Sequence, residues 1–187
     1  MTREEAQTIL TQMTTSESLL RHARTVELVM EAYANKLGED TSKWAITGLL
    51  HDADYQAYPD QHPNVIVNLL RERGEDEIAH AISAHYTHWG VPYDTLLDKA
   101  LLACDELTGF IVACAQIRPQ RLEGLEAKSV VKKLGQKSFA ASVDRDEVRI
   151  GAELFGVDMQ EHIAFIIAVL QQNQHELQLQ PQKGTQV

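Results

Sequence analysis

The sequence predicts an all-α protein. Apolar residues recur every three or four positions along most of the 187-residue chain, which is the spacing of one face of a helix. No segment shows the alternation of apolar and polar residues that is typical of a strand. Glycine and proline interrupt the periodic segments, as they do at helix ends. We therefore expect a helical bundle in one domain over residues 1–178, followed by a disordered, glutamine-rich tail over residues 179–187.

The expected helices can be justified in order along the chain. Thr14 and Glu17 have the spacing of a capping box that opens the second helix, and Gly38 ends that helix. Pro63 suits the first position of the fourth helix, and Pro119 ends the longest apolar helix. The helices expected in the first half span about residues 3–13, 16–38, 42–52, 63–73 and 76–88. Those in the second half span about residues 94–118, 128–134, 144–155 and 159–177.

Charge and apolar content disfavour several classes of function. A net charge of −10 disfavours a protein that binds nucleic-acid polymers, because phosphate backbones require clustered cations. No apolar run is long enough to cross a bilayer, and the N-terminal segment lacks the apolar region of a secretory signal. Cys104 and Cys114 fall in one expected helix, about 15 Å apart, which is too far for a disulfide. We therefore expect a cytoplasmic protein with no membrane or nucleic-acid partner, and its oligomeric state stays open.

Histidines and carboxylates interrupt the apolar faces of several expected helices. His22 shares a helix face with Val26, and Asp105 lies inside the apolar run LLACDELTGFIVACA. The run AITGLLHDADY ends in His51 and Asp52. Taken singly, such a histidine is usually a hydrogen-bonded core residue, and such an aspartate is usually half of a salt bridge. Gly109, one turn after Asp105, leaves room for a ligand.

Two further histidines extend the pattern, since His62 opens the fourth helix and His85 follows the apolar face of the fifth. Residues on five helices thus point toward one interior. We expect them to converge on one site, because each polar side chain can be buried if the others are its partners. Imidazole and carboxylate ligands suit iron, manganese, zinc, cobalt or nickel. Six ligands exceed the four of a tetrahedral zinc site and suit two metal ions bridged by a carboxylate.

The order His, His-Asp, His, His, Asp resembles that of the HD-domain superfamily of metal-dependent phosphohydrolases. The resemblance extends over roughly residues 19–119, with similar features to about residue 170. LLHDADY looks like the HD motif itself, and the segments DQHP, ISAHYTHW and LDKALLACDELTGFIVACAQIRP look like the later metal-binding helices. The chain is particularly similar to a bacterial HDIG-type hydrolase subfamily. The resemblance implies an HD-domain helical bundle with additional C-terminal helices.

The resemblance also implies roles for individual residues. It assigns one or two divalent transition metals (Fe, Mn, Zn, Co or Ni) to His22, His51, Asp52, His62, His85 and Asp105. Asp52 matches the bridging residue, while His62 and His85 match ligands of a second metal that help with proton transfer in a one-metal form. Many members read His-Asp-Ile-Gly followed by lysine. Asp54 departs from that pattern, and we expect it to be a partner of a ligand or else a solvent contact.

The function that the resemblance implies is hydrolysis of a phosphate ester or phosphoanhydride in a small phosphorylated metabolite or nucleotide, with metal-activated hydroxide as the nucleophile. Some members use nearly the same six ligands in a mixed-valent di-iron oxygenase, which is the alternative. A non-catalytic metal-binding module is a third possibility.

Cations cluster in the segment 118–137 of this acidic chain, and we expect them to bind substrate phosphates if the segment folds over the mouth of the site. Otherwise they form a solvated basic helix face. The candidate substrate-binding residues are Arg118, Lys132, Lys133 and Lys137 of this segment, and Lys99 nearer the N-terminus.

Overall fold

The computed structural model describes residues 1–182, and within them every regular element is helical. In the N-terminal half lie α1 (Arg3–Met13), α2 (Glu17–Leu37), α3 (Thr41–Leu50), α4 (Asn64–Glu72) and α5 (Asp76–His85). A 3₁₀ helix, η1 (Thr87–Trp89), follows, and then α6 (Leu96–Gln116), α7 (Ala127–Leu134), α8 (Arg145–Phe155) and α9 (Met159–Gln172). The all-α prediction is confirmed.

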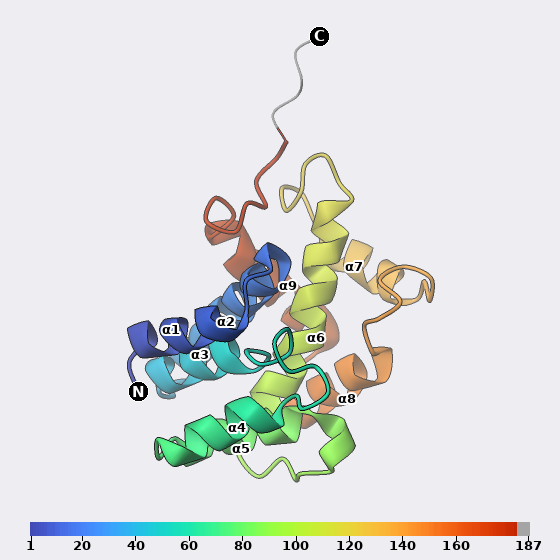
Figure 1. Ribbon diagram of the computed structural model, residues 1–187. Coiled ribbons are helices and arrows are strands. Elements are labelled where there is room, and N and C mark those ends of the chain that lie inside the picture. Colours follow the sequence, from blue (N-terminus) through green and yellow to red (C-terminus); the bar gives the residue numbers. More distant parts are fainter. Residues whose placement is uncertain (183–187) are drawn as a thin grey trace.

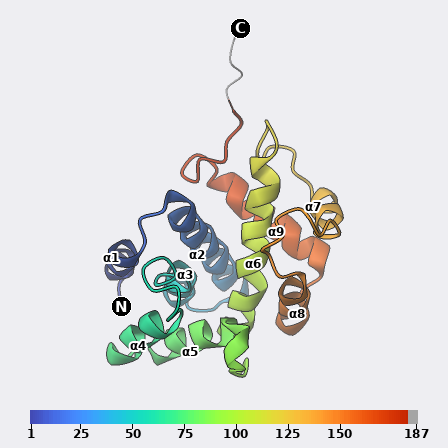
Figure 2. The same ribbon diagram turned by 45° about the vertical axis from the view of Figure 1, so that its right-hand side comes forward.

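Helix α6 runs through the middle of the molecule, as Figures 1 and 2 show. α1, α2 and α3 lie on one side of α6, α4 and α5 lie near its N-terminal half, and α7 and α8 lie on its other side. α9 passes behind α6 and contacts α2, α6 and α7. The most extensive helix pairs are α2 with α3 and α6 with α8. The buried apolar side chains form one connected core, in which Tyr33 and Phe110 are among the largest members. This packing brings the C-terminal ends of α3 and α5 against the middle of α6.

Two glycines allow the two extensive pairs to pack closely. A Cβ atom at Gly48 of α3 would lie 2.8 Å from the carbonyl oxygen of Val26 in α2. A Cβ atom at Gly151 of α8 would lie 2.8 Å from Cα of Ala103 in α6. Both neighbours are backbone atoms, which cannot move aside as a flexible side chain can. Each pair of helices therefore approaches to a distance that only glycine permits.

The start of α2 differs from the sequence prediction. The capping box of Thr14 and Glu17 is wrong, because the N-cap is Ser16 and its side chain makes no capping hydrogen bond. The Thr14 hydroxyl instead donates to the carbonyl oxygen of Ala53, at 2.9 Å, and is buried there. Thr14 thus ties the start of α2 to the turn that follows α3, a contact that local sequence spacing cannot reveal.

The ends of two later helices also differ from the prediction. The helix expected over residues 76–88 ends at His85 and is followed by η1, and the last helix ends at Gln172 rather than near residue 177. Leu179, in the tail expected to be disordered, is 1% exposed, and its carbonyl oxygen accepts the N–H of Leu122 at 3.5 Å. The structure therefore differs from that expectation for residues 179–182, and residues 183–187 lie outside the described part of the chain.

Cys104 and Cys114 both lie buried in α6 and are unpaired, as their spacing predicted. Burial raises the pKa of both thiols, that of Cys114 to about 11. Among the described helices, none combines the length and the apolar character needed to cross a membrane.

His162 joins three helices. The Tyr33 hydroxyl of α2 donates to its Nδ1 at 2.6 Å, and its Nε2–H donates to the carbonyl oxygen of Ala103 in α6 at 2.9 Å. The side chain is 1% exposed, and burial lowers its pKa below the ordinary value. The neutral imidazole therefore fastens α9 to α2 and α6.

Replacing Gly48 with alanine should destabilise the fold by about 1–3 kcal/mol, because the added methyl group meets the backbone of α2. Denaturant unfolding of both proteins measures the difference. Gly135→Ala is the matched control, since its Cβ would lie 3.5 Å from the carbonyl oxygen of Lys132, an ordinary contact. Equal stability of Gly48→Ala and the unchanged protein would contradict the close packing of α2 on α3.

His162→Gln should weaken the dependence of stability on pH. The pKa of His162 is lowered in the folded state, so the unfolded chain binds the proton more tightly and stability falls as pH drops below the unfolded value of about 6.5. The slope from one such group is at most about 1.4 kcal/mol per pH unit. Urea unfolding between pH 7.5 and 5.5 should show a smaller loss for the variant, and an unchanged slope would refute this role.

Candidate metal centre

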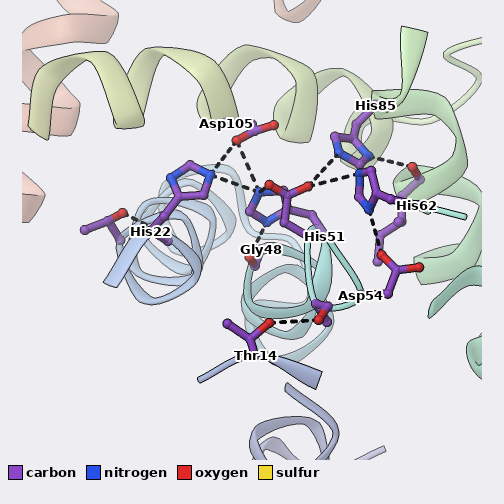
Figure 3. A network of polar contacts seen from close by, with 12 residues as sticks. Thr14, His22, Gly48, His51, Asp54, His62, His85 and Asp105 are labelled. Carbon is purple, nitrogen blue, oxygen red and sulfur yellow. Dashed lines mark hydrogen bonds and ion pairs between the residues drawn. The ribbon is translucent and has the colours of Figure 1, made fainter. Parts of the chain in front are cut away.

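Six side chains meet where α3 and α5 end against the middle of α6 (Figure 3). Four of them come from separate segments of the chain, and the other two are adjacent in sequence. They are His22 of α2, His51 and Asp52 at the end of α3, His62 just before α4, His85 at the end of α5, and Asp105 of α6. The structure therefore brings together all six residues that the sequence singled out as ligands.

The first group surrounds Nε2 of His51. Nε2 of His22 lies 3.1 Å from Nε2 of His51, and Oδ1 of Asp105 lies 2.9 Å from the former and 3.2 Å from the latter. Oδ2 of Asp52 lies 3.6 Å from Nε2 of His51. Separations of roughly 3–4 Å are those of donor atoms that share one ion at ~2 Å from each.

The second group lies on the other side of Asp52. Nε2 of His62 is 3.3 Å from Oδ1 of Asp52, and Nε2 of His85 is 3.7 Å from the same oxygen. Oδ1 of Asp52 thus faces His62 and His85, whereas Oδ2 faces His51. Asp52 belongs to both groups whose donor atoms lie within 4.8 Å of one another. A carboxylate with one oxygen in each group is placed as a bridge between them.

The remaining nitrogens of three imidazoles are held by the protein. Nδ1–H of His51 donates to the carbonyl oxygen of Gly48 at 2.8 Å, and Nδ1–H of His85 donates to that of Ile82 at 2.5 Å. Because a carbonyl can only accept, Nδ1 carries the proton and Nε2 presents its lone pair to the site. This is the arrangement that orients histidine ligands in metalloproteins.

Asp54 holds the third imidazole. Its Oδ1 accepts Nδ1–H of His62 at 2.6 Å, and its Oδ2 accepts the N–H of Ile66 in α4 at 3.0 Å. The carboxylate has no exposed surface. Of the two expectations for Asp54, the structure excludes a solvent contact and shows a partner of His62.

Burial and mutual charge determine the electrostatics of the first group. Burial acts to lower the pKa of His51, but Asp105 and Asp52 outweigh it and raise that pKa to about 10. Burial acts to raise the pKa of Asp52, but His51 and His85 outweigh it and bring that pKa to about 2. Through His51 and His22, the pKa of Asp105 also falls well below its ordinary value. Both carboxylates are therefore ionised and able to neutralise a cation.

The donor set fits a divalent transition metal. It combines imidazole nitrogens with carboxylate oxygens in two groups, without thiolate, and the histidines have oriented Nε2 atoms. Its two parts share Asp52, so they suit two ions as well as one. The residues fit the expected cofactor, and the assignment of each as a ligand remains a prediction.

A cavity of about 490 Å³ opens over these groups. His22, Asp52, His62, His85 and Asp105 form part of its lining, together with aromatic and acidic residues that the sequence did not single out. These additional residues include Tyr55, Tyr86, His88, Glu106, Asp144 and Glu147. Burial, and then the charge of Asp105, raise the pKa of Glu106 to about 7. No local signal placed Asp144 and Glu147 here, since they reach the cavity through the packing of α8 on α6.

The expected substrate-binding cations do not line this cavity, and their role in binding substrate stays a prediction. Arg118, Lys132 and Lys133 line a separate cavity of about 330 Å³, while Lys99 and Lys137 line neither. The chain after α7 does reach the site, but through Ser142, Val143 and Asp144 rather than through its lysines. Clustering of cations in the sequence therefore does not show which side chains face the cavity.

Arg145 explains how this segment is held. Its guanidinium donates to the carbonyl oxygens of Phe139, Ala140 and Val143, the last at 2.5 Å, and it lies 4.8 Å from the ring centroid of Phe110. The cation nearest in sequence to Asp144 is thus directed into its own loop and away from the cavity.

Gly109 lies beside His22. A Cβ atom there would be 3.6 Å from Nδ1 of His22, in ordinary contact, and Gly109 also lines the cavity. The space that this glycine leaves is therefore next to a candidate ligand, as the sequence suggested, and is bounded by the imidazole itself.

Residues 19–109 match the family model described as HD domain. The match is shorter than the roughly 19–119 expected from the motifs, but it contains all six candidate ligands. Neither the curated proteins nor the solved structures contain a match to the chain. The matched segment, the all-helical fold and the ordered set of histidines and aspartates agree, and residues 19–109 form an HD domain.

Proposed function

We propose that this protein is a metal-dependent phosphohydrolase that acts on a small phosphorylated metabolite. The observation that carries the proposal is the position of Asp52, with Oδ2 toward His51 and Oδ1 toward His62 and His85. HD domains are typically metal-dependent phosphohydrolases, so the family match supports the same reaction class. A cavity of about 490 Å³ suits a small molecule.

The proposal gives each residue a definite task. His22, His51 and Asp105 would hold one ion, His62 and His85 would hold a second, and Asp52 would take part in both positions. Divalent ions at these positions would polarise phosphoryl oxygens and supply a water-derived nucleophile near neutral pH. The hydrogen bonds from His51 to Gly48 and from His85 to Ile82 keep the ligand nitrogens aimed at the cavity.

In a one-metal form, His62 is the better placed proton acceptor. Its Nδ1–H donates to the buried carboxylate of Asp54, which stabilises the imidazolium that forms when Nε2 takes a proton. His85 has only the neutral carbonyl of Ile82 at the same position. Asp54 therefore holds the imidazole of His62 in place, with Nδ1 engaged and Nε2 free to face the site.

The test uses protein purified without chelators. Elemental analysis should find a transition metal, and a panel of phosphorylated metabolites should give phosphate release without oxygen consumption. Oxygen uptake coupled to product, with the EPR signal of a mixed-valent di-iron centre after aerobic reconstitution with iron, would assign the oxygenase alternative instead. Metal-dependent folding without turnover of any substrate would assign a binding module.

Asp105→Ala should lower the metal content and reduce phosphate release by about 100-fold or more, since loss of even an outer partner costs about 10–100-fold. The reason is that Oδ1 of Asp105 contacts both His22 and His51. His175→Ala is the control, because His175 is exposed and outside the cavity. Unchanged metal stoichiometry in Asp105→Ala would overturn the assignment.

Asp54→Asn should weaken the second metal position selectively, by about 10–100-fold in affinity. Asparagine cannot supply the negative charge that orients and polarises His62, whereas the first group does not contact Asp54. Metal titration should show one tight and one weakened site. Asp60→Asn, an exposed carboxylate in the same connecting segment, is the matched control. Two equally weakened sites, or none, would count against this role.

A further inference from the structure

The cavity over the metal centre has an acidic outer part. Beyond the candidate ligands it is lined by Glu106, Asp144 and Glu147. Among residues 1–182, no lysine or arginine lines it. A site that recognised a polyphosphate through the protein would need such cations, because a dianion beside uncompensated carboxylates is repelled.

The nearest arginines are engaged elsewhere. Arg145 donates to three carbonyl oxygens of its own loop, and Arg149 of α8 donates to Glu153 at 3.0 Å. Both lie close in sequence to Asp144 and Glu147 yet are fixed by these bonds. The acidity of the cavity is therefore a property of the folded structure.

The three carboxylates have only neutral donors within the described residues. Asp144 caps α8 by accepting the N–H of Asp146 at 2.8 Å. Glu106 accepts the N–H of Asp144 at 3.2 Å, and Glu147 accepts the hydroxyl of Thr87 at 2.5 Å. None of these donors carries a positive charge, so a ligand cation can pair with Asp144 and Glu147.

Aromatic rings are a second feature of the lining. Tyr55 and Tyr86 line the cavity close to His62, each with its ring centroid 5.5 Å from that of the histidine. Tyrosine faces attract organic cations.

We propose that the substrate is a phosphomonoester of an amino alcohol. Its phosphoryl group would lie at the metal centre, and its ammonium group would lie among Glu147, Asp144 and the tyrosine rings. This inference rests on the proposed function for the phosphoryl end, whereas recognition of the cation depends on the outer cavity alone. Nucleoside polyphosphates are disfavoured by the same carboxylates.

The test compares molecules that differ only in charge. Calorimetric titration of the metal-loaded protein should show that choline binds roughly tenfold more tightly than its uncharged isostere 3,3-dimethylbutan-1-ol. Phosphate release should likewise favour phosphocholine over 3,3-dimethylbutyl phosphate, and O-phosphoethanolamine over propyl phosphate, in kcat/KM. Equal binding of the two alcohols would overturn the inference. Choline binding without any phosphate release would uphold cation recognition and reject the phosphohydrolase proposal.

Glu147→Gln removes one charge and keeps the shape of the side chain. It should reduce the binding preference for choline over its isostere by about half an order of magnitude or more. Glu153→Gln is the matched control on the same helix, since Glu153 pairs with Arg149 and does not line the cavity. Metal content and thermal unfolding report whether each variant is intact. An intact Glu147→Gln variant that retained the full preference would also refute the inference.

Discussion

The burial of His51 is the constraint on which the rest of the site depends. Its imidazole has no exposed surface and lies at the end of an apolar helix, where an unpartnered polar ring would be costly. Gly48 accepts its Nδ1–H, and the carboxylates of Asp52 and Asp105 lie near its Nε2. These partners come from one turn back, the next residue and a distant helix. The contacts that compensate the burial of this one imidazole therefore fix the position of α3 relative to α6.

Gly48 connects this constraint to the packing of the bundle. Its missing side chain allows α3 to approach the backbone of α2, and its carbonyl oxygen orients His51. The close approach also carries His22 to within 3.1 Å of His51. The geometry of the candidate metal centre and the packing of α2 on α3 thus depend on the same residue. A substitution that disturbs this packing should also disturb the geometry of the centre.

Sequence patterns predicted the helices and the convergence of six polar side chains, because apolar periodicity shows which residues face inward. They could not predict contacts that depend on the three-dimensional course of the connections. Thr14 has the spacing of a cap, yet its hydroxyl bonds to Ala53 in another segment. Asp54 has no visible role until the turn after α3 places it between His62 and Ile66. None of the basic segment 118–137 lines the cavity. The chain reaches it only at Ser142, Val143 and Asp144, and the guanidinium of Arg145 is bonded to its own loop.

The distribution of charge also constrains the order of events at the site. Five carboxylates line one cavity of a chain whose net charge is −10, and no lysine or arginine of residues 1–182 joins them. A phosphate group has little reason to enter such a cavity unless cations at the inner carboxylates reverse the local charge. Metal binding should therefore precede binding of the phosphoryl group, while the outer carboxylates stay free for the opposite end of the substrate. A molecule with one negative and one positive end matches this division better than a polyanion does.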